Sequence, residues 1–253
     1  MDNCIGRAFG VLGCNKYVKL KNEIMKFGVI IFPGSNCDRD LIHVLETVMQ
    51  QEVIELWHKE TSLTMLDKND CIMVPGGFSY GDYLRSGALA SQSPIMQAVK
   101  THAAMGGYVW GICNGFQILC ESGLLPGALL RNENQKFSCC NTYLLPTNTS
   151  TKITQKLDPN MGYKIPIAHA EGRYYADPET LNKMEINKQI VFKYCNKNGS
   201  VATESNPNGS INNIAGICNE THTVFGMMPH PERAAEAILG NTDGRAMFES
   251  FLA

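Results

Sequence analysis

The sequence predicts an α/β fold in which a mostly parallel sheet has helices on both faces and gains additional antiparallel strands in the C-terminal half. Two observations indicate this arrangement. In the first half, short apolar runs are each followed by a turn and then by residues of helical periodicity, the order expected of parallel strands joined by right-handed crossovers. Between residues 129 and 226, shorter strand-like runs alternate with polar turns, which is typical of antiparallel hairpins.

The composition is that of a globular protein and gives no sign of a nucleic-acid-binding or membrane protein. The 253 residues permit one large α/β domain or two small ones, and 44% of them are hydrophobic, which is ordinary for a globular protein. The formal charge of −2 gives no reason to expect a nucleic acid or an anionic membrane as a partner. No apolar stretch is long enough to span a bilayer.

The first 24 residues stand apart from this pattern, because they lack both a clear period and the apolar core of a signal peptide. We expect residues 1–24 to be an N-terminal extension, either not native or loosely packed, and residues 25–253 to form the domain. The ten cysteines include no C-x-x-C pair, so no metal site is expected. Without an export signal, these cysteines are expected to remain reduced thiols in the cytoplasm.

The domain begins with an expected strand and helix. Residues 27–32 are nearly all apolar, as is typical of a strand whose two faces are both covered. In the turn at residues 33–36, Ser35 or Asn36 can cap the helix that follows. The apolar residues on one face of that helix are Leu41, Val44, Leu45 and Val48.

Three more strands are expected in the first half, at residues 53–57, 70–74 and 108–112, with a helix over residues 91–105. The loop at residues 75–87 follows one of these strands, and it combines glycines with bulky aromatic residues. Ligands of open α/β sheets bind at the carboxyl ends of the strands, so this loop is interpreted as functional rather than as a flexible connection.

The strand at residues 108–112 runs directly into Cys113, which has Gly111 and Gly115 two residues to either side. This arrangement has the form of a nucleophile elbow, in which a strand turns sharply into a helix. The side chain at the apex lies beside a helix N-terminus, where partial positive charge favours a thiolate. We expect Cys113 to be a nucleophile and the other nine cysteines to be structural or incidental.

In the C-terminal half, the expected strands end with a short terminal helix over residues 243–252, with Met247, Phe248 and Phe251 facing inward. The strand-like runs before that helix lie at residues 137–145, 163–167, 190–195, 214–217 and 223–227.

A nucleophilic cysteine needs a base, and the base needs an orienting group. His230 lies between two prolines that hold the backbone extended, and residues two apart in an extended segment point the same way. Glu232 is therefore expected to contact His230. Among the other histidines, His43 and His102 are interpreted as solvated on helix surfaces, and His58 and His222 are given no role.

Acyl transfer also requires donors for the oxyanion. The backbone N–H of Asn114, directly after the nucleophile, is one candidate, and Gly76 and Gly77 on the neighbouring loop supply the other. Gln117 lies one helical turn after Cys113. Its side chain is expected either to bind the substrate or simply to begin the helix surface.

Taken together, these residues resemble the class I, triad-type glutamine amidotransferases, through GICNGFQ at residues 111–117 and a later His-Pro-Glu. Further stretches resemble the glutaminase subunits of phosphoribosylformylglycinamidine synthase, and the resemblance runs from Met25 to the C-terminus. These stretches are FPGSNCD (32–38), PGGFSYGDYLR (75–85), HAEGR (169–173) and MPHPER (228–233).

The resemblance implies a flavodoxin-like sheet and a glutaminase that forms a thioester on Cys113 and releases ammonia and glutamate. It implies that the ammonia passes to a larger, PurL-like synthetase subunit, which converts formylglycinamide ribonucleotide to the amidine in purine synthesis. A small, PurS-like accessory subunit is also implied. No cofactor is expected on this chain, and ATP and Mg²⁺ are expected on the synthetase, since the sequence has no phosphate-binding loop motif.

Three alternatives remain at this stage. The chain could be a glutaminase subunit that serves another ATP-dependent amidotransferase. It could be a cysteine hydrolase or chaperone of the same fold, although such proteins need not carry a His-Pro-Glu segment. It could also be a binding subunit without catalysis, which the complete set of Cys113, His230 and Glu232 disfavours. The roles of His169, Glu171 and Arg173 are left open.

Overall fold

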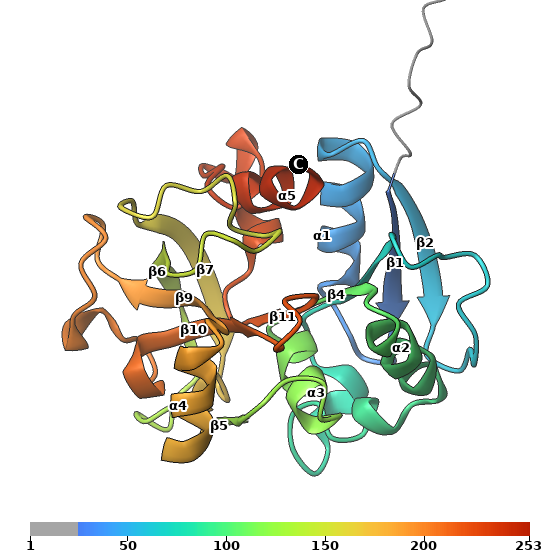
Figure 1. The fold of residues 1–253 in the computed structure, drawn as a ribbon, viewed down its shortest axis with the longest axis horizontal. Coiled ribbons are helices and arrows are strands. Elements are labelled where there is room, and N and C mark those ends of the chain that lie inside the picture. Colours follow the sequence, from blue (N-terminus) through green and yellow to red (C-terminus); the bar gives the residue numbers. More distant parts are fainter. Residues whose placement is uncertain (1–24) are drawn as a thin grey trace, which may run out of the picture.

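A nine-stranded sheet forms the centre of residues 25–253, the part of the chain that the computed structural model describes. The extension expected at residues 1–24 lies outside the described residues. The strand order is β2-β1-β3-β4-β11-β10-β9-β6-β7, and Figure 1 shows the sheet passing between two groups of helices. The strands are β1 Lys26–Ile31, β2 Glu52–Trp57, β3 Cys71–Val74, β4 Tyr108–Ile112, β6 Ser138–Pro146, β7 Tyr163–His169, β9 Ile190–Cys195, β10 Ile214–Cys218 and β11 Val224–Met227.

The first five strands of this order, from β2 to β11, are parallel to one another. This confirms the predicted parallel sheet, with one addition. The run at residues 223–227 forms the predicted antiparallel hairpin, with β10, but on its other side β11 pairs in parallel with β4, and Met227 lies opposite Ile112. All four residues of this strand are buried, so its sequence has no alternating pattern that would distinguish a parallel from an antiparallel neighbour. Its pairing with β4 could therefore not be predicted. The consequence is that the chain after β11 emerges beside the end of β4.

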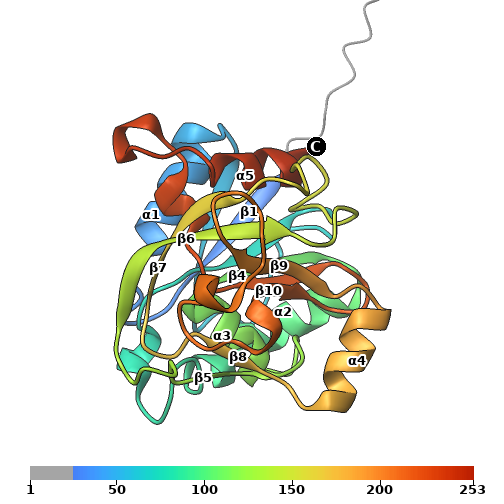
Figure 2. The same ribbon diagram turned by 90° about the vertical axis from the view of Figure 1, so that its left-hand side faces the viewer.

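The antiparallel half of the sheet is also confirmed, because β10, β9, β6 and β7 all pair with antiparallel neighbours. Figure 2 shows these strands from the side, with α4 (Pro178–Ile186) at one end. Helix α4 is not among the predicted helices, although Asp177 and Pro178 mark its start. The Asp177 carboxylate accepts a hydrogen bond from the backbone N–H of Thr180 at 3.0 Å, which is an N-cap. The small sheet of β5 (Ala128–Leu130) and β8 (Arg173–Tyr175) was missed as well.

Helices cover both faces of the parallel half. In Figure 1, α1 (Asp38–His43) and α5 (Arg245–Leu252) lie on one side, and α2 (Pro94–Ala104) and α3 (Asn114–Glu121) on the other. A π-helical turn at Val44–Val48 continues α1. The inward orientation of α5 is confirmed, since Phe251 packs against aromatic residues of three strands, namely Phe27, Tyr108, Trp110 and Phe225.

Two details of the predicted helices are wrong. The first helix has Cys37 at its N-cap and no side-chain cap, and Ser35 instead donates to the Gly76 carbonyl at 2.8 Å. The second helix begins at Pro94 rather than near residue 91, because proline is favoured in the first helical turn. Ser35 therefore ties the turn before α1 to the loop after β3, next to Cys113.

Position 115 requires glycine because the backbone of β3 leaves no room for a side chain there. A Cβ atom on Gly115 would overlap the carbonyl oxygen of Val74 at the end of β3 and would lie 2.7 Å from its carbonyl carbon. Because the obstacle is backbone, it cannot move aside by a rotamer change. The small residue lets α3 start directly against β3.

We therefore expect Gly115→Ala to lower the free energy of unfolding by about 3 kcal/mol or more, as severe overpacking does. Urea denaturation followed by circular dichroism measures the change. Gly123→Ala is the control, because a Cβ there meets nothing within 4 Å and only a left-handed φ of +75° opposes it, which costs about 1 kcal/mol. Equal losses for the two variants would contradict this steric account of the elbow.

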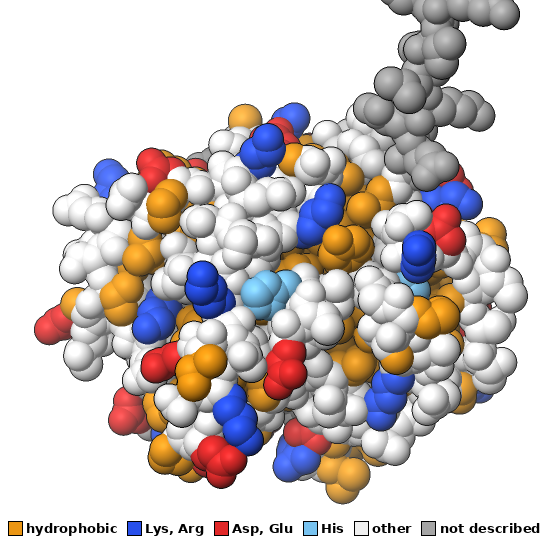
Figure 3. Space-filling view, viewed as in Figure 1, with side chains coloured by type: hydrophobic (Ala, Val, Ile, Leu, Met, Phe, Trp, Pro, Cys, Tyr) orange, Lys and Arg blue, Asp and Glu red, His pale blue; other side chains and the backbone are white. Residues whose placement is uncertain are grey.

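The distribution of charged side chains on the surface agrees with the small net charge. On the face shown in Figure 3, acidic and basic side chains are interspersed, and neither sign gathers into a large patch. Within residues 25–253, no helix is long and apolar enough to cross a membrane.

Candidate active site

Cys113 occupies the apex of the turn between β4 and α3, as predicted. Its backbone has φ 51° and ψ −106°, a strained conformation for a residue with a side chain. Its N–H donates to the Met227 carbonyl at 2.7 Å, which ties the apex to the end of β11. Strain held in place by the sheet at a strand-to-helix turn is the signature of a nucleophile elbow.

His230 and Glu232 are brought together as expected, but by a different backbone. The segment is not extended through Glu232, because a 3₁₀ helix begins at Pro231. His230 Nδ1 nevertheless lies 2.5 Å from Glu232 Oε1, and both side chains are buried. Within the described residues, His230 Nε2 and Glu232 Oε2 have no hydrogen-bond partner. The carboxylate thus holds Nδ1 and leaves Nε2 free for chemistry.

Gly76 shows how closely the imidazole approaches Cys113. A Cβ atom on Gly76 would lie 2.8 Å from His230 Cε1 and 3.4 Å from Cys113 Cβ. Burial alone lowers the pKa of His230, but the Glu232 carboxylate and the Cys113 sulfur outweigh it and raise that pKa to about 10. The structure therefore places cysteine, histidine and glutamate in the order that a catalytic triad requires.

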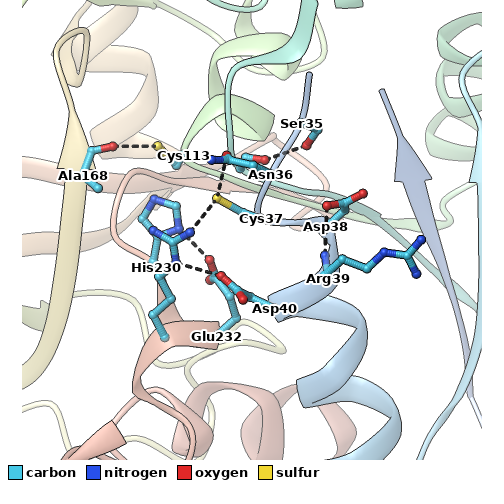
Figure 4. A network of polar contacts seen from close by, with 12 residues as sticks. Ser35, Asn36, Cys37, Asp38, Arg39, Asp40, Cys113, Ala168, His230 and Glu232 are labelled. Atoms are coloured by element: carbon cyan, nitrogen blue, oxygen red, sulfur yellow. Dashed lines mark hydrogen bonds and ion pairs between the residues drawn. The ribbon is translucent and has the colours of Figure 1, made fainter. Parts of the chain in front are cut away.

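Cys113 opens into a cavity of about 110 Å³. This is smaller than the sites that hold drug-sized ligands, so it suits a small substrate. The Cys113 sulfur lies 3.8 Å from the Ala168 carbonyl oxygen, and Figure 4 shows it pointing toward that strand. The lining residues come from the loop after β3, the elbow and the segment after β7: Gly77, Phe78, Asp82, Ser86, Cys113, Gln117, Ala168, His169, Ala170 and Glu171.

The two glycines predicted to bind substrate differ in position. Gly77 lines the cavity beside Cys113, and its φ of +119° is one that only glycine adopts readily. A Cβ there would also lie 2.5 Å from the Asn36 backbone nitrogen. Gly76 is not among the residues that line the cavity, and it packs against His230 instead. Of the two, Gly77 keeps the place expected of an oxyanion donor.

Gln117 lines the cavity, and Asn114 supports it from behind through a shared hydrogen-bond network. Asn114 is the first residue of α3, so its N–H is one of those left without a partner inside the helix. Its side-chain amide donates to Asp82 at 3.2 Å and to Gln117 Oε1 at 2.9 Å. Gln117 Nε2 donates to the Glu171 carbonyl at 2.5 Å. Both amides therefore connect the loop after β3 to the segment after β7.

His169 is the site residue that the sequence analysis left without a role. Its Nδ1 lies 3.1 Å from Asn132 Oδ1, which also accepts from the Gly172 N–H. Since that oxygen can only accept, His169 carries its proton on Nδ1 and presents a bare Nε2. That nitrogen is buried and has no partner within residues 25–253. Burial, followed by the positive charge of His230, lowers the pKa of His169 to about 4.

This depressed pKa predicts an acid-dependent loss of stability. Between about pH 6.5 and pH 4 the unfolded chain binds a proton at residue 169 that the folded chain excludes, so stability falls as the pH falls. We expect a contribution of about 3 kcal/mol. Urea denaturation across this pH range gives the free energy of unfolding of the wild type and of His169→Gln. The difference between the two pH profiles is the contribution of His169. Parallel pH profiles of the two proteins would contradict the assignment.

The loop at residues 75–87 is anchored rather than flexible. The Tyr80 hydroxyl lies 2.6 Å from His58 Nδ1 and 3.0 Å from Ser93 Oγ, and Arg85 forms an ion pair with Glu121 of α3. His58 thus holds the loop in place, a role that the sequence analysis did not give it. The expectation that His102 is solvated is also wrong, since that side chain is buried beneath Gly107.

The sequence predicts a structural or incidental role for Cys37, but this cysteine lies beside the triad. Its sulfur would be 3.3 Å from a Cβ on Gly76, the same point that His230 and Cys113 approach. Arg233 Nη2 donates to this sulfur at 3.1 Å, and Figure 4 shows Cys37 next to His230 and Glu232. The position of Cys37 after the first strand of the parallel sheet was the available signal, because parallel strands end at one edge.

Comparison with known proteins agrees with this geometry. Residues 25–248 match the family of CobB/CobQ-like glutamine amidotransferase domains. The chain is 53% identical over 228 residues to the phosphoribosylformylglycinamidine synthase subunit PurQ of Acaryochloris marina, covering 90% of this chain and 96% of that protein. It is 54% identical over 228 residues to the PurQ subunit of Moorella thermoacetica, covering 90% and 95%.

A solved structure extends the comparison to the fold. The structure of PurLQS from Thermotoga maritima contains a chain that matches with a TM-score of 0.77 and 40% identity, over 90% of this chain and 97% of that chain. The apical cysteine, the buried histidine–glutamate pair and these matches lead to one conclusion. The chain belongs to the CobB/CobQ-like glutamine amidotransferases, and within them to the PurQ subunits of phosphoribosylformylglycinamidine synthase.

Proposed function

We propose that this chain hydrolyses glutamine to glutamate and ammonia and supplies the ammonia to a synthetase subunit of phosphoribosylformylglycinamidine synthase. The observation that carries the hydrolytic part is the strained Cys113 apex, which opens into a small cavity beside the buried His230–Glu232 pair. The step to purine synthesis is supported by relatives of 53% and 54% identity that are PurQ subunits.

The residues support a two-step acyl transfer. His230, held by Glu232, takes the thiol proton as the Cys113 sulfur attacks the side-chain carboxamide of glutamine, and it passes that proton to the nitrogen as the C–N bond breaks and ammonia leaves. Water then attacks the thioester with His230 as the base, and glutamate leaves. The N–H groups of Gly77, which lines the cavity with Cys113, and of Asn114, which follows Cys113 in the chain, are the proposed donors to the oxyanion.

The cavity walls suit an amino acid. Asp82 and Glu171 contribute carboxylates, and His169 contributes the unpartnered Nε2. These acceptors complement the α-ammonium group of glutamine, whose three N–H donors need partners when it leaves water. Burial raises the pKa of Asp82 above its usual range, so a cationic group beside it would favour its ionised form.

The proposed partner is a larger, PurL-like synthetase subunit, and the Thermotoga relative is found in a structure of PurLQS. Beside the cavity, the loop after β3 exposes Tyr83 and Leu84, whose side chains are 74% and 87% accessible. Exposed apolar side chains of this kind suit a protein partner. ATP and Mg²⁺ are proposed to bind the synthetase, a small PurS-like subunit to complete the assembly, and the reaction to take place in the cytoplasm.

The test is to mix the purified chain with its synthetase subunit and to measure glutamate release. We expect glutamine to be hydrolysed, and asparagine, which is one methylene shorter, to be a poor substrate because its carboxamide does not reach Cys113. Release of glutamate only in the presence of the synthetase would also support the assignment. If the mixture releases none, the proposed function is wrong.

A further inference from the structure

A third metal-ligating side chain lies against the His230–Glu232 pair. One donor atom from each of Cys37, His230 and Glu232 lies within 4.8 Å of the other two, and all three residues are buried. Zinc bonds to sulfur, nitrogen and oxygen are about 2.0–2.3 Å long, so the ligands of one tetrahedral ion lie roughly 3–4 Å apart. Small side-chain shifts would therefore bring these three atoms onto one ion.

Two atoms of this cluster have no hydrogen-bond partner among the described residues. Within the described residues, Glu232 Oε2 and His230 Nε2 are buried without a hydrogen-bond partner, although His230 has Cys113 as its neighbour. A buried polar atom without a partner is costly. A bound cation would give the free carboxylate oxygen a partner of opposite charge.

A bound ion would displace protons from both Cys37 and His230, because the raised pKa of each group keeps it protonated without an ion. Burial, and after it the Glu232 carboxylate, raises the pKa of Cys37 to about 12, so without an ion Cys37 keeps its proton. A divalent ion supplies the positive charge that stabilises the thiolate, and the thiol proton is released to solvent as the metal–sulfur bond forms. Arg233, which donates to the sulfur at 3.1 Å, would hold that thiolate in place.

A separate cavity lies against Glu232, whose carboxylate is buried behind its wall. Its volume is about 490 Å³, and its lining carries three carboxylates against one guanidinium. Asp40 pairs with Arg233 and Glu236 with His43, which leaves Glu232 as the lining carboxylate without a basic partner from that lining. None of its residues lines the Cys113 cavity, so this side of the cluster is separate from the proposed substrate site. The lining residues are Asp40, His43, Glu232, Arg233, Glu236 and Leu239.

We propose that Cys37, His230 and Glu232 form an inhibitory site for a thiophilic divalent cation, with Zn²⁺ as the probe. An ion held by His230 and Glu232 prevents the imidazole from carrying protons to and from substrate, so hydrolysis stops until the ion is removed. The inhibitory effect rests on the proposed glutaminase function, whereas the binding site does not.

Binding is tested first, on the full chain and without substrate. Co²⁺ serves as the probe because cobalt–thiolate bonds give a charge-transfer absorption in the near ultraviolet. We expect this band in the wild type and in Cys113→Ala, and we expect its loss in Cys37→Ala and Cys37→Ser. The double variant Cys139→Ala/Cys140→Ala, which removes two exposed thiols, should keep the band. An undiminished band in both Cys37 variants would overturn the proposal.

Inhibition is tested next, with each variant compared with its own metal-free rate of glutamate release. Zn²⁺ should inhibit the wild type, and EDTA should restore the rate. Cys37→Ala should need at least about tenfold more Zn²⁺ for half inhibition, since loss of even an indirect partner typically weakens metal sites about 10–100-fold. Equal half-inhibiting concentrations would contradict the site. Cobalt binding through Cys37 in a chain that releases no glutamate would support the site and overturn the proposed function.

Discussion

Replacing Cys113 with alanine is expected to slow glutamine hydrolysis by about 10⁵-fold or more, because the group that forms the thioester is lost. The fold should survive, since the strained backbone at this position is held by β4, α3 and the hydrogen bond to Met227. Glutamate release in the presence of the synthetase, followed by a coupled dehydrogenase assay, measures the change.

The matched control is Cys139→Ala, because Cys139 is a free but exposed cysteine on β6. This variant should hydrolyse glutamine at the wild-type rate. If Cys113→Ala kept more than a small fraction of the activity while Cys139→Ala lost it, the nucleophile would have been assigned to the wrong cysteine.

Removing the base should be almost as damaging as removing the nucleophile. His230→Ala is expected to lose about 10⁵-fold in rate, and Glu232→Ala to lose less, by roughly 10⁴-fold, because orientation rather than the proton acceptor disappears. The buried contact of 2.5 Å between Nδ1 and Oε1 is the reason to expect that Glu232 matters at all. Rates measured at saturating glutamine separate this loss from weaker binding.

The double variant His230→Ala/Glu232→Ala sharpens the test. If Glu232 acts only by orienting His230, the double variant should be no slower than His230→Ala, because residues that act as a unit are not additive. Losses that multiply would show that Glu232 has an independent role, contrary to this account.

The nucleophile could be predicted from sequence because its constraints are local. Gly111 and Gly115 flank Cys113 within five residues, and the structure shows that a Cβ on Gly115 would collide with the backbone of Val74. The same holds for the strands of the first half, whose apolar runs and turns are consecutive in the chain. β4 and β9 even have the predicted bounds.

What could not be predicted depends on contacts between distant segments. The position of β11 beside β4 follows from sheet pairing, and no periodicity in four buried residues reports it. Cys37 and His169 come from different parts of the chain and meet near Cys113 only after the sheet forms. The helix α4 is a different case, because the Asp177 cap and Pro178 were visible in the sequence and were overlooked.

The central claim is that this chain makes ammonia for a second subunit, and one comparison tests it most directly. The chain is assembled with its synthetase subunit, and formylglycinamidine ribonucleotide formation is measured with glutamine and, separately, with ammonium chloride as the nitrogen source. The account predicts that Cys113→Ala loses the glutamine-dependent reaction and keeps the ammonium-dependent reaction at the wild-type rate. Glutamine-dependent synthesis that survives in Cys113→Ala would contradict it.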